Sequence, residues 1–292
     1  MYDTLPASPD QHAALAIAQS AGPRLLHLAR AACGEISCPT CGPDANRSAY
    51  GRRSGYDLSR CNSCGLVFLN TVGASIAQEF FDDAAADHKE SADAIEYWSF
   101  PSLYDRYQSV FESFFAERWN RLREAHSDIR SLLDIGCGYG FFLRHVKSVV
   151  PTVSGVEIDL EAAQYARRRF DLPVSHMPIE RYDSKAPLDC MVMCDVLEHL
   201  HKPDYALRRC RDMLAPGGIV FLQVPNHVGF RLPRGHSWGL PHHIWQFNPK
   251  SLRRLVESCG LIPEDHYTGV LGVIGAYERG GPTMRERREW LL

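Results

Sequence analysis

The chain has 292 residues, of which 45% are hydrophobic and 23% are charged, and its formal net charge is -3. This composition excludes disordered and collagen-like proteins, and such a charge would not attract nucleic acid or an anionic membrane. The length predicts one main domain of about 150 to 200 residues with an appendage.

No segment has the pattern of a membrane span or an export signal. The longest nearly apolar run is IVFLQV at 219–224, whereas a bilayer span needs roughly 20 residues. The first residues place no basic region before an apolar stretch. We therefore expect a cytoplasmic protein without membrane partners, whose ten cysteines stay reduced.

The chain divides into four predicted parts: a helical arm (1–32), a region of cysteine pairs (33–72), a helical linker or lid (73–127) and a main domain (128–292). In the arm, apolar residues at 11–32 recur at helical steps, with a break at Gly22-Pro23. The linker carries an aromatic stripe on one helix face: Tyr104, Tyr107, Phe111, Phe114, Phe115 and Trp119. The stripe predicts a core face, or a cover over the active site that offers Tyr104 or Tyr107 to a substrate.

From residue 131 onward, apolar runs alternate with helical stretches. Strands are predicted at 131–135, 153–157, 189–194 and 219–224, and helices near 140–148, 160–169, 204–214 and 249–258. Further strands are expected near 173–176, 264–268 and 271–277. This alternation is typical of an α/β fold with a doubly wound, Rossmann-like parallel sheet that helices cover on both faces.

The segment LLDIGCGYGFFL runs from a strand through a glycine turn into a helix. Gly136, Gly138 and Gly140 follow one another at G-x-G-x-G spacing, at the sheet edge where such folds bind ligands. Glu157 ends the next strand, 21 residues after Gly136. A carboxylate there can accept hydrogen bonds from both hydroxyls of a ribose. Together these features predict a nucleoside cofactor.

Four motifs, DIGCGYG, GVEID, LDCMVMCDVLEHLHKP and LAPGGIVFLQVPN, resemble in order those of class I S-adenosylmethionine-dependent methyltransferases. The resemblance spans about residues 128–260 and implies S-adenosyl-L-methionine as cofactor. It assigns the methionine portion to Asp134 and the Gly136 turn, the ribose to Glu157, the border of the adenine to Met177 and Pro178, and the cofactor's amino group to Cys194. Structural roles remain open for Asp134 as a turn cap, Glu157 as a solvated acid and Cys194 as a core residue.

The cysteine pairs CPTC and CNSC are separated by 19 residues. This spacing is typical of a four-thiolate zinc site, here Cys38, Cys41, Cys61 and Cys64. A glycine follows each pair, Gly42 and Gly65, which lets the turn direct backbone amides at the thiolates. Four protein ligands leave no open position, so we expect a structural Zn²⁺ site in a zinc ribbon, with a rubredoxin-like iron site as the alternative.

A zinc ribbon ahead of this domain resembles bacterial methyltransferases that tailor sugars and natural products, including enzymes that methylate carbon on nucleotide-linked keto-sugars. More distantly, it is similar to ribosomal-RNA methyltransferases with an N-terminal zinc site.

Two histidine settings are candidates for catalysis. Glu198 and His199 follow the fourth strand, where His199 could orient or deprotonate an acceptor, or bond a backbone carbonyl. Residues 235–252 suit a lid over a small substrate and precede a helix capped by Asn248. Within them, PHHIWQF resembles the family segment P-E-H-x-x-x-F, whose histidine is implicated as a base, and the resemblance places that role on His243. His242 stands where the family has glutamate, which disfavours carbon methylation.

The sequence thus predicts an S-adenosylmethionine-dependent methyltransferase acting on a small-molecule acceptor, such as a sugar or a natural-product intermediate. Oxygen is favoured over carbon, and His243 and His199 are the predicted catalytic residues. RNA methylation is the alternative, with a ribbon surface of Arg47, Arg52, Arg53 and Arg60. A non-catalytic cofactor-binding scaffold is the third hypothesis. No pattern indicates an oligomeric state.

Overall fold

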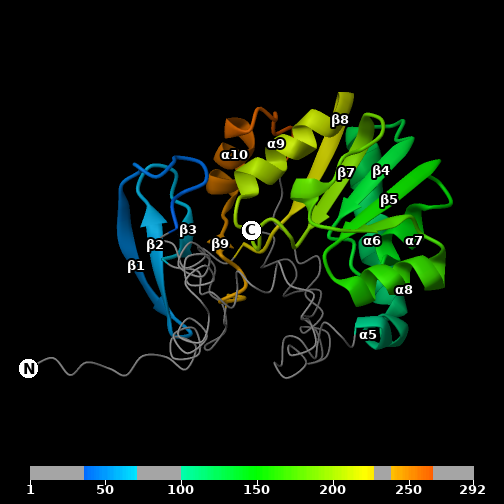
Figure 1. Cartoon of the computed structure of the whole chain (residues 1–292), viewed down its shortest axis with the longest axis horizontal. Coiled ribbons are helices and arrows are strands. Elements are labelled where there is room, and N and C mark those ends of the chain that lie inside the picture. The colour runs from blue at the N-terminus through cyan, green and yellow to red at the C-terminus, as the bar shows by residue number, and fades with distance from the viewer. Residues whose placement is uncertain (1–35, 71–99, 227–237, 266–292) are drawn as a thin grey trace, which may run out of the picture.

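The computed structural model describes residues 36–70, 100–226 and 238–265 (Figure 1). Within these ranges it contains an antiparallel sheet of order β1-β2-β3-β9 and a parallel sheet of order β6-β5-β4-β7-β8. The predicted arm helix lies outside the described residues, as does the predicted strand at 271–277 and most of the one at 264–268. No helix in the described ranges has the length and apolar character needed to cross a bilayer.

The parallel sheet confirms the predicted doubly wound α/β fold. Its strands are β4 (Ser131–Ile135), β5 (Thr152–Glu157), β6 (Val174–His176), β7 (Leu188–Cys194) and β8 (Leu214–Gln223). The helices that follow the strands are α7 (Phe141–Val146), α8 (Leu160–Phe170), η2 (Ile179–Arg181), α9 (Pro203–Met213) and α10 (Pro249–Ser258). β8 begins earlier than predicted because Leu214 already pairs with Leu188, ahead of an irregularity in the register.

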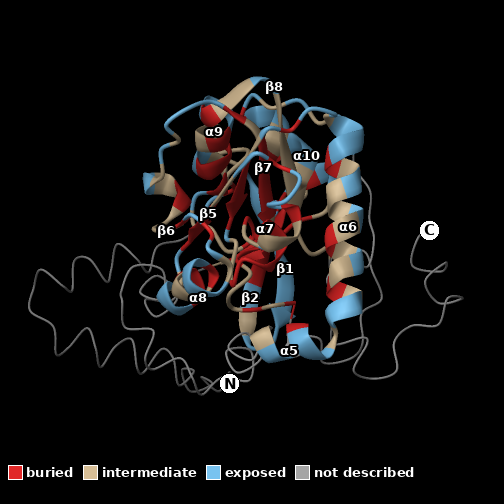
Figure 2. Ribbon diagram, turned by 90° about the vertical axis from the view of Figure 1, so that its right-hand side faces the viewer, coloured by how far each residue is buried: buried red, intermediate tan, exposed pale blue. Residues whose placement is uncertain are grey.

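Helices cover both faces of this sheet. On one face, Leu133 and Ile135 of β4 join a buried cluster with residues of α9 and α10. On the other face, Leu132 of β4 packs among residues of α7, α8 and α6 (Gln108–Ala125). Figure 2 shows the buried strands in the middle with α6 running along one side. The two-residue period of β4 therefore directs Asp134 to the α6 side.

The aromatic stripe forms part of the core. Tyr104 lies on α5 (Phe100–Arg106) and is 2% exposed, and its ring stacks on Phe141 at a centroid distance of 3.9 Å. Its hydroxyl donates to Glu112 and accepts from Nη2 of Arg144, which lies 3.0 Å away. Phe111 and Phe115 are buried beside it. Tyr104 is therefore a core residue, and the alternative in which it serves a substrate is not supported.

The antiparallel sheet joins the cysteine region to the segment predicted as a lid. Strands β1 (Arg47–Arg53), β2 (Tyr56–Cys61) and β3 (Val67–Leu69) form a meander. Strand β9 (Trp245–Gln246) pairs with β3 and comes from the predicted lid. Figure 1 shows β9 between the meander and the parallel sheet. Leu66 and Phe68 lie in the same buried cluster as Leu133, so the ribbon packs on the face of the sheet that α9 and α10 cover.

Candidate functional site

The glycine turn follows β4 at the carboxyl edge of the parallel sheet. Gly136 and Gly140 have left-handed backbone conformations, with φ of +69° and +78°. A Cβ on Gly136 would lie 2.3 Å from Cγ2 of Val196, and a Cβ on Gly140 would lie 2.8 Å from Cβ of Ala166. The turn packs closely against α8 and against the loop that follows β7, and therefore only glycine fits at these two positions.

Glu157 ends β5 beside this turn and is 5% exposed. Its Oε2 accepts a hydrogen bond from the Gly138 amide at 2.7 Å, and its Oε1 accepts one from the Asp159 amide at 2.9 Å. Burial raises the pKa of Glu157, while the two backbone amides oppose this effect. Since each carboxylate oxygen has about two lone-pair positions, Glu157 can fasten the turn and still accept from a ribose.

Asp134 lies at the end of β4 and is 4% exposed. Burial raises its pKa to about 7, and the guanidinium of Arg118 on α6 acts in the opposite direction. Arg118 Nη2 lies 3.5 Å from Oε1 of Gln223, and its guanidinium carbon lies 4.8 Å from the centre of the Phe142 ring. The sequence prediction missed Arg118, although its position three residues after the buried Phe115 already indicated a charge near the inner face of the helix.

The remaining predicted cofactor residues end neighbouring strands at the same edge. Met177 and Pro178 follow β6 and are half-buried, and the Met177 amide donates to the Glu157 carbonyl at 3.1 Å. Cys194 ends β7, where burial raises the pKa of its thiol. The next residue, Asp195, has φ of +56° and accepts a hydrogen bond from Nε2 of Gln223 at 2.9 Å. The structure therefore brings the predicted cofactor residues together along one edge.

The two predicted catalytic histidines lie together, and Glu198 joins them. One nitrogen or carboxylate oxygen from each of Glu198, His199 and His243 lies within 4.8 Å of the other two. His199 Nε2 is 3.9 Å from Oε1 of Glu198, and the His199 and His243 rings have centroids 4.6 Å apart. Glu198 is 1% exposed, and neither of its carboxylate oxygens has a hydrogen-bond partner among the described residues. We call these three residues the Glu198 cluster.

Backbone contacts fix this cluster from several sides. His199 Nδ1 lies 3.1 Å from the His242 carbonyl, so Nδ1 donates the proton and Nε2 keeps its lone pair. Burial lowers the pKa of His199 to about 4, and His242 adds to that effect. Burial also raises the pKa of Glu198 well above its ordinary value. The Ile244 amide donates to the Glu198 carbonyl at 2.9 Å, which connects the β7 loop to β9.

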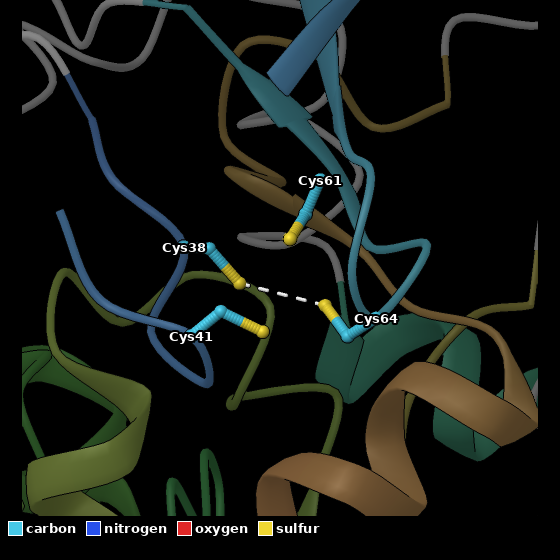
Figure 3. Close-up of side chains that lie close together, drawn as sticks. All are labelled: Cys38, Cys41, Cys61 and Cys64. Carbon is cyan, nitrogen blue, oxygen red and sulfur yellow. Dashed lines mark hydrogen bonds between the residues drawn. The ribbon is translucent and has the colours of Figure 1, made fainter. Parts of the chain in front are cut away.

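Four cysteines converge in the ribbon (Figure 3). Their sulfur atoms all lie within 4.8 Å of one another, and Sγ of Cys38 is 3.5 Å from Sγ of Cys64. A zinc tetrahedron with Zn–S bonds of about 2.3 Å has sulfur atoms about 3.8 Å apart. The glycine after each pair has a positive φ, and its amide donates to the carbonyl of the first cysteine of that pair at 2.9 Å.

The thiols of Cys38 and Cys64 influence each other's ionisation. Contact with Cys38 lowers the pKa of Cys64 to about 5, and the same contact raises the pKa of Cys38. The spacing and the donor set therefore fit a closed zinc centre, in which all four positions belong to the protein.

The part of the chain that contains this sheet is similar to proteins of known family. Residues 104–264, more than half of the chain, match a family of methyltransferase domains. A probable S-adenosylmethionine-dependent methyltransferase of Mycolicibacterium smegmatis is 28% identical over 138 residues, which is 47% of this chain and 53% of that protein. A ubiquinone biosynthesis O-methyltransferase of Caulobacter vibrioides is 28% identical over 175 residues, or 54% of this chain and 69% of the relative.

Among solved structures, CalS10 is described as an amino pentose methyltransferase from Micromonospora echinaspora. It is 26% identical and has a TM-score of 0.36, over 38% of this chain and 49% of that chain. The chain spans about half the length of the first curated relative it matches. The predicted fold, the order of the motifs and the domain match agree with one another, and the chain belongs to the family of S-adenosylmethionine-dependent methyltransferases.

Proposed function

We propose that this methyltransferase acts on an oxygen atom of a small polar acceptor, such as a sugar or a natural-product intermediate. The proposal rests on one observation: the Glu198 cluster lies at the same sheet edge as the glycine turn. Val196, two residues before Glu198, is the side chain that a Cβ on Gly136 would strike. Relatives named as O-methyltransferases support oxygen as the acceptor atom.

The cofactor side of the site has groups that suit S-adenosyl-L-methionine. The turn at Gly136 exposes backbone to the ligand, the Asp134 carboxyl suits an ammonium group, and the Glu157 carboxylate suits a ribose. Met177 and Pro178 would border the adenine, and Cys194 would face the cofactor's amino group. When bound, the cofactor supplies a methyl group activated on a sulfonium. The protein's contribution is to hold the acceptor oxygen in line with that methyl and to exclude water.

The acceptor hydroxyl must lose its proton as the methyl–oxygen bond forms and the methyl–sulfur bond breaks. We assign the proton to His243, with Nε2 of His199 accepting a hydrogen bond from a second polar group of the acceptor and so orienting it. His242 stands where the related motif has glutamate, but Glu198 provides an acidic group from a different loop, within 4.8 Å of both histidines. This arrangement supports a role for the histidine pair in proton removal.

Transfer of a labelled methyl group to a panel of hydroxylated small molecules tests the proposal. His243→Ala should lower turnover by roughly 10²–10⁴-fold with S-adenosylmethionine affinity unchanged, the usual contribution of a general base. His199→Ala should have a smaller effect, and His201→Ala in the same loop is the matched control.

Three other outcomes would each contradict a part of the proposal. Joint loss of turnover and cofactor affinity in His243→Ala would make His243 structural. Label appearing in RNA and in no small molecule would favour the RNA alternative. Cofactor binding without any methylated product would favour a scaffold.

A further inference from the structure

The Glu198 carboxyl group is buried next to the two proposed catalytic histidines. It is 1% exposed, and neither oxygen has a hydrogen-bond partner among the described residues. Burying a carboxylate without partners is costly, so such groups are paired with positive charge or coordinate a metal. No lysine or arginine is recorded within salt-bridge distance of Glu198 in the described ranges, and its recorded ion-pair partner is His199 at 3.9 Å. The site therefore has a buried carboxyl group whose ionised form a cation would balance.

The two histidines provide the nitrogen ligands that such a cation would need. His199 Nδ1 donates to the His242 carbonyl, which leaves the lone pair of Nε2 available near the Glu198 oxygen. A ligating histidine commonly has its second nitrogen fixed by a carbonyl in this way. The His243 amide donates to the Gly239 carbonyl at 2.8 Å, and a Cβ on Gly239 would lie 2.2 Å from Nδ1 of His243.

We propose that Glu198, His199 and His243 bind one divalent transition cation, and that this cation binds the oxygen of the acceptor. Two neutral imidazoles and one carboxylate suit Zn²⁺, Co²⁺, Mn²⁺ or Fe²⁺. Ligands bonded to one such ion at about 2.0–2.2 Å lie about 3 to 3.5 Å apart. The ligand atoms here lie within 4.8 Å, so small side-chain rotations bring them to that distance.

This site differs in kind from the ribbon centre. Four thiolates close the ribbon site, whereas three protein ligands leave at least one position open, as in catalytic metal sites. The ligand set carries one negative charge, so the bound ion leaves a net positive charge beside the acceptor. A hydroxyl bound to such an ion loses its proton more readily, and the proton passes to solvent. With the ion bound, His243 acts as a ligand and not as the base proposed above, because a neutral imidazole has one lone pair; without the ion, His243 is free to act as that base.

The inference rests on the proposed function for the identity of the acceptor, and its test uses neither cofactor nor acceptor. Co²⁺ is titrated into the full chain with the ribbon already loaded with zinc, followed by calorimetry and visible absorption. We expect one equivalent of Co²⁺ with the spectrum of nitrogen and oxygen ligands. Glu198→Gln and His243→Gln should weaken binding at least tenfold, and His201→Gln should bind as the wild type does. Cofactor affinity and thermal melting of each variant report whether it has folded.

The possible results separate the cation site from the proposed function. Absence of a second metal equivalent, a thiolate spectrum, or equal binding by Glu198→Gln and the wild type would overturn the cation site. Methyl transfer that persists in a protein without this cation would leave the proposed function intact. Co²⁺ bound at these ligands in a protein that methylates no hydroxylated acceptor would count against the proposed function alone.

Discussion

Asp134 and Asp189 are two carboxyl groups near opposite ends of neighbouring strands, and their surroundings differ. Burial raises the pKa of Asp134 to about 7. Burial acts in the same direction on Asp189, but hydrogen bonds from Ser131 and from the Arg130 amide outweigh it and lower its pKa. The first group suits a positively charged ligand, whereas the second already has its partners within the protein.

This difference gives a pH prediction for Asp134→Asn. A carboxyl whose folded-state pKa is raised makes the folded state less stable as the pH rises from about 4 to about 7. For Asp134 the full effect is roughly 4 kcal/mol. The cofactor-free variant should therefore gain more thermal stability relative to wild type at pH 8 than at pH 5. It should also bind S-adenosylmethionine more weakly.

Asp189→Asn is the matched control for melting curves at the two pH values. Its lowered pKa contributes stability that is already complete at pH 5, so the loss should be similar at both pH values. A stability difference for Asp134→Asn that does not depend on pH would contradict the raised pKa of this buried carboxyl.

Glu157→Ala should weaken S-adenosylmethionine binding about a hundredfold or more, because two ribose hydroxyls lose a charged acceptor worth roughly 1.5–3 kcal/mol each. Calorimetry measures the change. Asp159→Ala is the control, since Asp159 caps α8 through the Ala162 amide at 2.7 Å. That variant should lose about 1 kcal/mol of stability and keep most of its cofactor affinity. Unchanged affinity in Glu157→Ala would remove Glu157 from the ribose site.

The spacing of motifs along the sequence identifies the cofactor residues, which lie at the ends of successive strands. The glycine turn and Glu157 were found because each occupies a fixed place at the end of a strand. The sequence singles out Glu198 only as the neighbour of His199, since nothing in DVLEHLH indicates that its carboxyl lies buried with no hydrogen-bond partner among the described residues. Its proximity to His243 depends on the pairing of β9, which the sequence does not reveal.

The start of α10 could be predicted from local sequence alone. Asn248 caps this helix as the sequence predicted, and Ser251 completes a reciprocal cap, with Pro249 in the first turn. Strands β4, β5 and β7 were also predicted closely, because buried parallel strands are continuous apolar runs. Strand β9 has two residues and no such pattern. Its pairing with β3 links positions about 180 residues apart, so only the folded chain defines it.

Gly239 lies shortly before β9 and contacts the proposed catalytic residue His243. Its φ is +69°, and a Cβ there would collide with the His243 ring. Gly239→Ala should therefore displace His243 and lower turnover by at least tenfold, with cofactor affinity near wild type. The backbone strain should also reduce stability by about 1–2 kcal/mol.

Gly260→Ala provides a comparison at equal backbone strain. Gly260 has φ of +80°, and its Cβ would lie 3.0 Å from Nη1 at the far end of the Arg211 side chain. We expect a similar stability loss with nearly normal turnover. Equal losses of turnover in the two variants would show that strain, and not the position of His243, limits the reaction.

The four-cysteine ribbon and the parallel sheet share one buried cluster that contains Cys61, Phe68, Leu133 and Phe247. Further bonds join the two parts: Arg254 donates to the Ser63 carbonyl, and the Leu69 amide donates to the Ile244 carbonyl at 3.1 Å. The sequence indicated that the ribbon needs a metal to fold, but its polar composition gave no sign that it packs on the main sheet.

Cys61→Ser should consequently affect more than the ribbon. We expect loss of stoichiometric zinc, whose binding contributes of order 10 kcal/mol in small zinc peptides, and a lower melting temperature in a single transition. Turnover should fall because β9 positions His243. Metal analysis and calorimetric melting test this, with the buried Cys210→Ser on α9 as a variant that keeps its zinc. Iron in the wild type, or a zinc-free variant with normal turnover, would contradict the assignment.

The shared strand also limits how this enzyme can be divided or recombined. A shortened chain that starts at β4 would keep every cofactor residue predicted from the sequence but lose Arg118. Trp245 and Phe247 would also lose Phe68 and Leu66 from their buried cluster. The unpaired edge of β9 would then be open to another chain. In a chimaera, we therefore expect that the ribbon and residues 238–248 have to be exchanged together, because β9 pairs with β3 of the ribbon and closely follows the proposed catalytic His243.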